Sequence, residues 1–128
     1  MPRVFIVGGG FAGIAAAKAL AGAPAEVTLL DRRNHHVFQP LLYQVATASL
    51  SPADISAPIR TVLRGQKICE VALAEIIGVD TANRQRTVKD GYARYDYLVL
   101  AAGATHAYFG HDEWATLAPG LKSIEDAT

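Results

Sequence analysis

The sequence is poor in cysteine and has no excess of either charge. Its single cysteine, Cys69, excludes an internal disulfide, a CxxC redox pair and a thiolate zinc site within these residues. Twelve basic and twelve acidic side chains cancel, so the chain lacks the positive surface that nucleic-acid binding requires. The longest apolar stretch, YLVLAAGA at 97–104, is strand-sized, whereas a membrane-spanning helix needs roughly 18 residues.

The remaining composition is that of a folded domain. The chain has 128 residues, of which 51% are hydrophobic and 19% are charged. This apolar content suffices for a core and is too high for a disordered segment. No internal repeat or low-complexity tract divides the sequence. Its length predicts one domain over residues 1–128, with no second domain in the chain.

The beginning of the chain has the pattern of a strand, a helix and a second strand. Residues 3–7 (RVFIV) predict a buried strand. The alanine-rich residues 11–21 predict a helix that Gly22 ends. Residues 26–30 predict another strand, which finishes at Asp31. Because the connection is long enough for a crossover helix, we expect these two strands to be parallel.

The rest of the sequence predicts short helices and further strands. A short helix is expected near 41–47, and SPAD at 51–54 predicts the start of a helix over roughly 53–64. Asp90–Gly91 between apolar runs predicts a hairpin turn. The other expected elements are strands within 68–80, 84–89 and 94–104 and the start of a helix in the final SIEDAT. The predicted fold is therefore α/β and Rossmann-like, with three layers formed by a parallel sheet, its helices and a small antiparallel β-meander.

The stretch GGGFAG at 8–13 matches the GxGxxG pattern directly after the first predicted strand. In this pattern Gly8 makes the tight turn, Gly10 lets the backbone approach a pyrophosphate, and Gly13 lets the helix pack against the strand. The helix N-terminus offers N–H groups and partial positive charge to the phosphates. A plain strand–helix corner is the alternative, and the order strand, loop, helix, strand and acid favours a dinucleotide site.

Asp31 lies 18 residues after Gly13, at the end of the second predicted strand. A carboxylate at this place accepts the hydroxyls of the adenine-side ribose and repels a 2′-phosphate. Arg32 and Arg33 follow directly. They are either solvated loop cations or place one guanidinium near the adenine or its ribose.

Two other possible sites carry less support. His35 and His36 are adjacent, and neighbouring residues on extended backbone point to opposite sides. A structural loop pair is therefore favoured over a metal site. Disulfide reductases of related fold place a CxxxxC pair soon after the glycine loop. This chain has no such pair, so we expect that it is not a disulfide reductase.

Longer stretches carry a resemblance to a known family. NHHVFQPLLYQVA at 34–46 is the most specific of them, and YDYLVLAAGATHAYFGHDEW follows from residue 95. Together with the opening VFIVGGGFAGIAAAKAL, they make the chain similar to the amino-terminal part of type II, single-polypeptide NADH:quinone oxidoreductases. The resemblance spans essentially the whole chain. The glycine loop alone does not distinguish FAD from NAD. The resemblance implies that this loop binds FAD.

The resemblance also implies cofactor contacts by position. AAG at 101–103 resembles an ATG motif whose backbone passes the flavin, although Ala102 replaces the usual threonine and removes a hydroxyl. The strand around Val71–Ala74 would pass the adenine. With Arg32 added, the cofactor-binding residues expected are Gly8, Gly10, Phe11, Ala12, Gly13, Asp31, Arg32, Gln39, Pro40, Thr47, Ala72, Ala102 and Gly103. No catalytic side chain and no metal ligand are expected.

The family's activity gives the expected function. NADH passes a hydride to FAD, and the reduced flavin passes electrons to a membrane quinone in the respiratory chain. The cofactor carries the chemistry, while the protein binds and orients it. The resemblance implies a peripheral enzyme on the cytoplasmic side of the cell membrane.

The sequence lacks two features of that family, a second GxGxxG and a later Gly–Asp segment. We therefore expect a soluble fragment that holds part of the FAD site, has no activity alone and self-associates through exposed apolar faces. Two alternatives stay open. One is part of another two-dinucleotide flavoprotein, such as a sulfide:quinone, ferredoxin or rubredoxin reductase. The other is a non-catalytic nucleotide-binding module.

Overall fold

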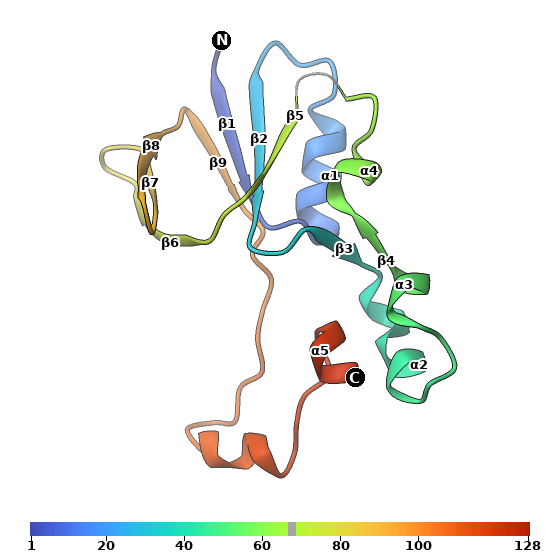
Figure 1. Ribbon diagram of the computed structural model, residues 1–128. Helices are drawn as coiled ribbons and strands as arrows, with labels where there is room; N and C mark the ends of the chain where they lie inside the picture. The colour runs from blue at the N-terminus through green and yellow to red at the C-terminus, as the bar shows by residue number, and fades with distance from the viewer. Residues whose placement is uncertain (67–68) are drawn as a thin grey trace. The chain divides into compact units, whose positions relative to one another are not determined.

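A computed structural model describes residues 1–66 and 69–128 of the chain (Figure 1). The chain forms two compact units. The first consists of Met1–His36 and Pro58–Gly103, and the second of Val37–Ala57 and Ala104–Thr128. Within the described residues, no helix is long and apolar enough to cross a membrane.

The first unit is built on a four-stranded parallel sheet. Its strands are β1 (Arg3–Val7), β2 (Glu26–Asp31), β5 (Cys69–Leu73) and β9 (Tyr97–Leu100), in the order β5-β2-β1-β9. The register places Val7 between Leu30 on β2 and Leu100 on β9. Strand β1 is therefore central, and the predicted parallel pairing of the first two strands is confirmed.

Helix α1 (Phe11–Ala19) packs on one face of this sheet. Ile14 and Ala17 of the helix are buried against Val4, Ile6, Val27 and Leu29 of the two central strands. Side chains on a strand alternate between the faces, so Val4 and Ile6 reach the helix while Phe5 faces the other way. The predicted helix 11–21 ends two residues earlier than expected, in a turn before Gly22.

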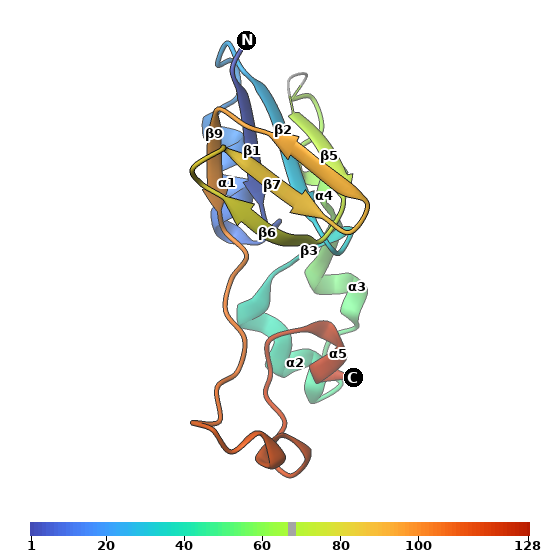
Figure 2. The same ribbon diagram turned by 90° about the vertical axis from the view of Figure 1, so that its left-hand side faces the viewer.

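The opposite face of the sheet is covered by an antiparallel meander (Figure 2). It consists of β6 (Ile76–Asp80), β7 (Gln85–Val88) and β8 (Gly91–Arg94), and the expected Asp90–Gly91 turn joins the last two strands. Buried Phe5, Leu30 and Tyr95 form the core of this layer. The three-layer α/β fold expected from the sequence is confirmed.

The predicted single helix over 53–64 is wrong. The structure has a short helix α3 (Pro52–Ile55), a strand β4 (Ser56–Pro58) and a helix α4 (Ile59–Val62). Pro58 has no N–H to donate within a helix, and it disfavours helical backbone at the residue before it. The predicted helix start at SPAD is confirmed, because Ser51 and Asp54 form a capping box around α3. The interruption lets β4 pair with β3 (His35–Val37).

The regular elements that lie wholly within the second unit are short helices. They are α2 (Leu42–Ala46), the 3-10 turns η1 (Gln39–Leu41) and η2 (Asp112–Thr116), and α5 (Ile124–Ala127), besides α3. Leu42, Val45, Ile55 and Ala127 form a small core. The predicted short helix near 41–47 and the helix start in the final residues are confirmed.

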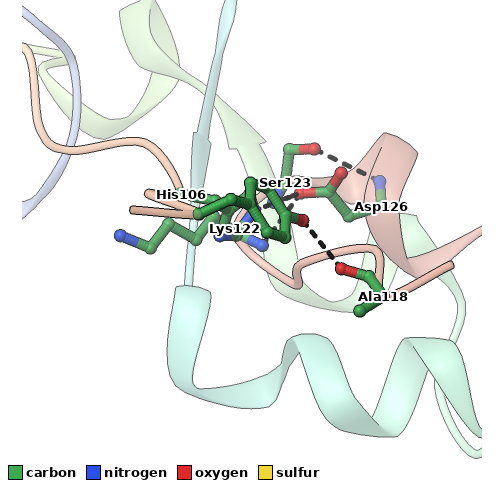
Figure 3. A network of polar contacts seen from close by, with 6 residues as sticks. His106, Ala118, Lys122, Ser123 and Asp126 are labelled. Carbon is green, nitrogen blue, oxygen red and sulfur yellow. Dashed lines mark hydrogen bonds and ion pairs between the residues drawn. The ribbon is translucent and has the colours of Figure 1, made fainter. Parts of the chain in front are cut away.

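The start of α5 is held by a network of polar contacts around Asp126 (Figure 3). Its Oδ2 accepts from the backbone N–H groups of Lys122 and Ser123 at 2.9 and 3.0 Å. His106 Nε2 lies 3.5 Å from the same oxygen. The N–H of Asp126 in turn donates to the Ser123 hydroxyl oxygen at 3.2 Å. These contacts satisfy N–H groups that the helix itself leaves unpaired.

Acid should release this cap only at a low pH. Hydrogen bonds from Lys122 N–H and from Ser123 hold the pKa of Asp126 at about 2, below its ordinary 3.8. Because the pKa is lower in the folded chain, the stabilisation is present above pH 3.8 and is lost as the pH falls through about 2. An NMR titration of the Asp126 carboxyl carbon should have its midpoint near 2, and Ser123→Ala should raise that midpoint. A wild-type midpoint near 3.8 would contradict the prediction.

Candidate dinucleotide-binding site

The glycine loop lies at the carboxyl ends of the parallel strands. It connects β1 to α1, and β1 has β2 on one side and β9 on the other. The chain runs from β1 to β2 and β5 on one side of β1, and only later adds β9 on the other side of β1. Such a reversal of strand order marks the place where open α/β sheets bind ligands.

Gly8 makes the turn out of β1 under two constraints that only glycine meets. Its φ is +107°, a conformation that side-chain-bearing residues rarely adopt. A Cβ at this position would also overlap the backbone of Ala101, lying 2.6 Å from its carbonyl carbon. This close approach follows from the pairing of β1 with β9, because Ala101 N–H donates to the Val7 carbonyl at 2.8 Å.

Gly13 allows the helix to approach the loop. A Cβ on this buried residue would overlap the carbonyl oxygen of Gly8 and lie 2.8 Å from its carbonyl carbon. Both obstacles are backbone atoms, which cannot move aside as a flexible side chain could. The sequence-based roles of Gly8 in the turn and of Gly13 in close packing agree with this geometry.

Gly10 is different, because the space beside it is open. Apart from Gly10 and its two chain neighbours, no described atom lies within 4 Å of the position that its Cβ would take. Gly10 is the N-cap residue of α1 and, as a glycine, offers no side chain to cap this helix end. An exposed helix N-terminus whose N-cap residue has no side chain and leaves open space can receive an anion such as a pyrophosphate.

Asp31 ends β2 beside the same loop. Its Oδ2 accepts from Gly9 N–H and its Oδ1 accepts from Arg33 N–H, both at 2.6 Å. Asp31 is half-buried, and these two hydrogen bonds fix the orientation of its carboxylate. An ionised carboxylate has about four lone-pair sites, so it can still accept from ribose hydroxyls.

Sequence reasoning missed the roles of Gly9 and His36. Gly9 is buried, and a Cβ there would overlap Ile59 Cδ1 of α4 and lie 3.2 Å from Asp31 Oδ2. His36 Nδ1 lies 2.9 Å from the Gly9 carbonyl oxygen. The middle glycine of GGG, which the GxGxxG pattern does not require, was a signal for Gly9. Nothing in the sequence pairs His36 with the loop.

The other predicted site residues fall into two groups. Phe11 and Ala12 begin α1, Arg32 is exposed after Asp31, and Ala72 is half-buried on β5. Ala102 and Gly103 follow β9 and are exposed, and Gly103 has a φ of +78°. These residues belong to the first unit, as do Gly8, Gly10, Gly13 and Asp31.

The remaining three predicted contacts belong to the second unit. Gln39 and Pro40 form the 3-10 turn η1, and Thr47 is the C-cap residue of α2. All three are exposed. The Thr47 hydroxyl donates to the Tyr43 carbonyl at 3.0 Å, a bond that helps to end α2.

Comparison with known proteins agrees with this arrangement. Residues 2–128 match the family of pyridine nucleotide-disulphide oxidoreductases. The chain belongs to this family. Its name refers in part to a disulphide chemistry that these residues cannot perform alone, since Cys69 is their single cysteine.

Sequence relatives narrow the class further. The chain is 48% identical to the type II NADH:quinone oxidoreductase NdhA of Mycobacterium tuberculosis and 46% identical to Ndh of the same organism. Each match covers 98% of this chain, and 27% and 28% of the relatives respectively. The chain thus spans just over a quarter of the length of these relatives.

Solved structures show the same fold. NDH2 of Plasmodium falciparum in complex with NADH matches with a TM-score of 0.88 and 25% identity, over 98% of this chain and 27% of that one. The sulfide:quinone oxidoreductase of Aquifex aeolicus matches with a TM-score of 0.85 and 26% identity, over 99% and 30%. These comparisons confirm the resemblance to type II NADH:quinone oxidoreductases. They also confirm that the family is one of FAD-dependent oxidoreductases.

Proposed function

We propose that residues 1–128 are the amino-terminal part of the FAD-binding domain of a type II NADH:quinone oxidoreductase. The observation that carries this proposal is the loop itself. Gly8 and Gly13 are required by close backbone contacts, whereas Gly10 leaves open space at the N-terminus of α1 beside Asp31. This division of roles is what a pyrophosphate site needs, and the 46–48% identity to two such enzymes supports the class.

The chain's residues would bind the ADP half of FAD. The first-turn backbone of α1 at Gly10, Phe11 and Ala12 faces the pyrophosphate, and Asp31 accepts from the ribose hydroxyls. We assign Arg32 and Ala72 to the adenine side. In the first unit we assign the backbone at Ala102 and Gly103 to the flavin side. Contacts of Gln39, Pro40 and Thr47 with the flavin stay a prediction from the family resemblance.

When bound, FAD supplies the site that accepts a hydride and passes electrons on. In the proposed enzyme the hydride comes from NADH and the electrons go to a quinone. No acid or base among the residues of this chain is assigned to bond breaking. Their contribution is to hold the cofactor's phosphates and ribose in one orientation.

We further infer a peripheral enzyme at the cytoplasmic face of the cell membrane, as expected for this class. For the isolated chain we propose self-association through the edge of its sheet. Tyr97 and Leu100 of β9 are 64% and 65% exposed, and exposed apolar side chains on a sheet edge favour association.

The purified chain should bind FAD, and ADP should compete for the same site. Because Asp31 repels a 2′-phosphate, adenosine 2′,5′-bisphosphate should compete far more weakly than ADP. Titration followed by flavin fluorescence measures all three ligands. Equal competition by the two adenine nucleotides would contradict the role of Asp31, and absence of FAD and ADP binding would refute the proposed function.

The same preparation should not oxidise NADH with a quinone, because the chain has one glycine loop and we assign that loop to FAD. A steady-state assay with added FAD measures this. Turnover would show that the nicotinamide also binds within these residues and would overturn the assignment.

A further inference from the structure

The Gly9 backbone is held by side chains at both of its polar groups. Its N–H donates to Asp31 Oδ2 at 2.6 Å, and its carbonyl oxygen lies 2.9 Å from His36 Nδ1. A carbonyl oxygen can only accept, so Nδ1 of His36 carries the proton in this contact. Asp31 lies at the end of β2 and His36 lies on β3. The side chains that hold the Gly9 backbone therefore come from other elements than the loop.

The His36 contact also fixes the residue that follows. The Gly9 carbonyl and the Gly10 N–H belong to one peptide unit, and in a planar trans peptide these two groups point in opposite directions. No cis peptide occurs in the described chain. Holding the carbonyl toward His36 therefore directs the Gly10 N–H, at the N-cap position of α1, away from His36.

We propose that His36 is a positioning residue for dinucleotide binding, which it serves by fixing the orientation of the Gly9–Gly10 peptide. The inference rests on the proposed function of the loop as a pyrophosphate site. Without the Nδ1 donor, this peptide can rotate and present the Gly9 carbonyl oxygen in place of the Gly10 N–H. Glycine permits such a rotation, and an oxygen facing a phosphate repels it.

Phe11 fixes the imidazole from another direction. The two rings make an edge contact, with centroids 5.2 Å apart and an interplanar angle of 88°. His36 is half-buried, and Phe11 is the first residue of α1. Simple packing against Phe11 is thus the competing explanation for His36. The two explanations differ in which substitution they tolerate.

Two substitutions separate the donor from the ring. In His36→Asn the side-chain nitrogen stands as many bonds from Cα as Nδ1 does, so the donor is kept and the ring is lost. In His36→Phe the ring is kept and the donor is lost. His35→Phe is the matched control, since His35 is the exposed neighbour on the same strand.

FAD titration of these variants gives the first result. We expect His36→Phe to weaken FAD affinity about tenfold, the effect of one lost hydrogen bond, while His36→Asn and His35→Phe stay within about threefold of the wild type. Loss of affinity in His36→Asn with retention in His36→Phe would overturn the inference in favour of packing. Unchanged affinity in both would overturn it as well.

A flavin-free measurement tests the inference even if the wild type fails to bind FAD, the result that refutes the proposed function. The heteronuclear NOE of the Gly10 amide should fall in His36→Phe and stay at the wild-type value in His36→Asn. Amides in the middle of α1 should not change in either variant. A Gly10 amide as rigid in His36→Phe as in the wild type would show that His36 does not hold this peptide.

Discussion

Replacing Gly13 with alanine should destabilise the chain by about 3 kcal/mol or more, a large part of the stability of an ordinary domain. The new methyl would overlap the Gly8 carbonyl oxygen and lie 2.8 Å from the carbonyl carbon. Both atoms belong to the turn that joins β1 to α1, and this turn is held on its other side by Ala101. Relief therefore requires the helix to move away from the sheet that it covers.

Urea unfolding followed by circular dichroism measures this effect. Gly10→Ser is the matched control, because it adds a larger side chain to the same loop at a position where, beyond the adjacent residues, no described atom lies within 4 Å of the Cβ. Serine is also a preferred N-cap residue, so this control should stay within about 0.5 kcal/mol of the wild type. A Gly13→Ala midpoint equal to that of the control would show that the loop tolerates a methyl there, contrary to the packing described.

The sequence predicted the elements of the first unit well because their signals are local. Each of β1, α1 and β2 has its own periodicity, and the turn Asp90–Gly91 is a short-range hairpin signal. The pairing of β9 with β1 joins residues more than ninety positions apart, and no local pattern encodes it. The predicted helix over 53–64 is interrupted for a local reason, because Pro58 breaks helical backbone that the capping box at Ser51 and Asp54 begins.

The candidate site shows the same limit. The spacing indicated which glycine makes the turn, which one lets the backbone approach a pyrophosphate and which one lets the helix pack on the strand. These roles follow from the strand–loop–helix order. The spacing could not show that Asp31 accepts from Gly9 and Arg33 before any ligand binds. It also could not show that His36 reaches the Gly9 carbonyl, because a contact between residues 27 apart depends on how β3 leaves the sheet.

The geometry thus separates two kinds of loop residue that look alike in the sequence. Gly8 and Gly13 are glycines because the protein's own backbone occupies the neighbouring space, and at Gly9 the Ile59 side chain fills that space. Gly10 is a glycine with no such neighbour among the described atoms. No described contact within the protein requires a glycine at position 10, so we infer that a bound ligand does. A substitution at Gly10 should therefore weaken ligand binding and leave folding intact.

Gly10→Val should abolish FAD binding in a chain that still folds. Its side chain would occupy the open space at the N-terminus of α1, where the pyrophosphate approaches the first-turn N–H groups. Loss of two hydrogen bonds to a charged group lowers affinity roughly 100-fold or more. The φ of Gly10 is −77°, which valine adopts without strain, so the loss of stability should be about 1 kcal/mol, the usual effect of a poor N-cap residue.

Calorimetric titration with FAD and with ADP measures the loss of affinity. Urea unfolding of the flavin-free chain measures the change in stability. Gly10→Ala should be intermediate, since one methyl fills less of the space. Gly78→Ala on β6 is the control, because a Cβ there would make an ordinary contact 3.8 Å from Thr87 Cβ. Retained FAD affinity in Gly10→Val would place the phosphates elsewhere. A large loss of stability would show that Gly10, like Gly13, is small for the sake of the fold.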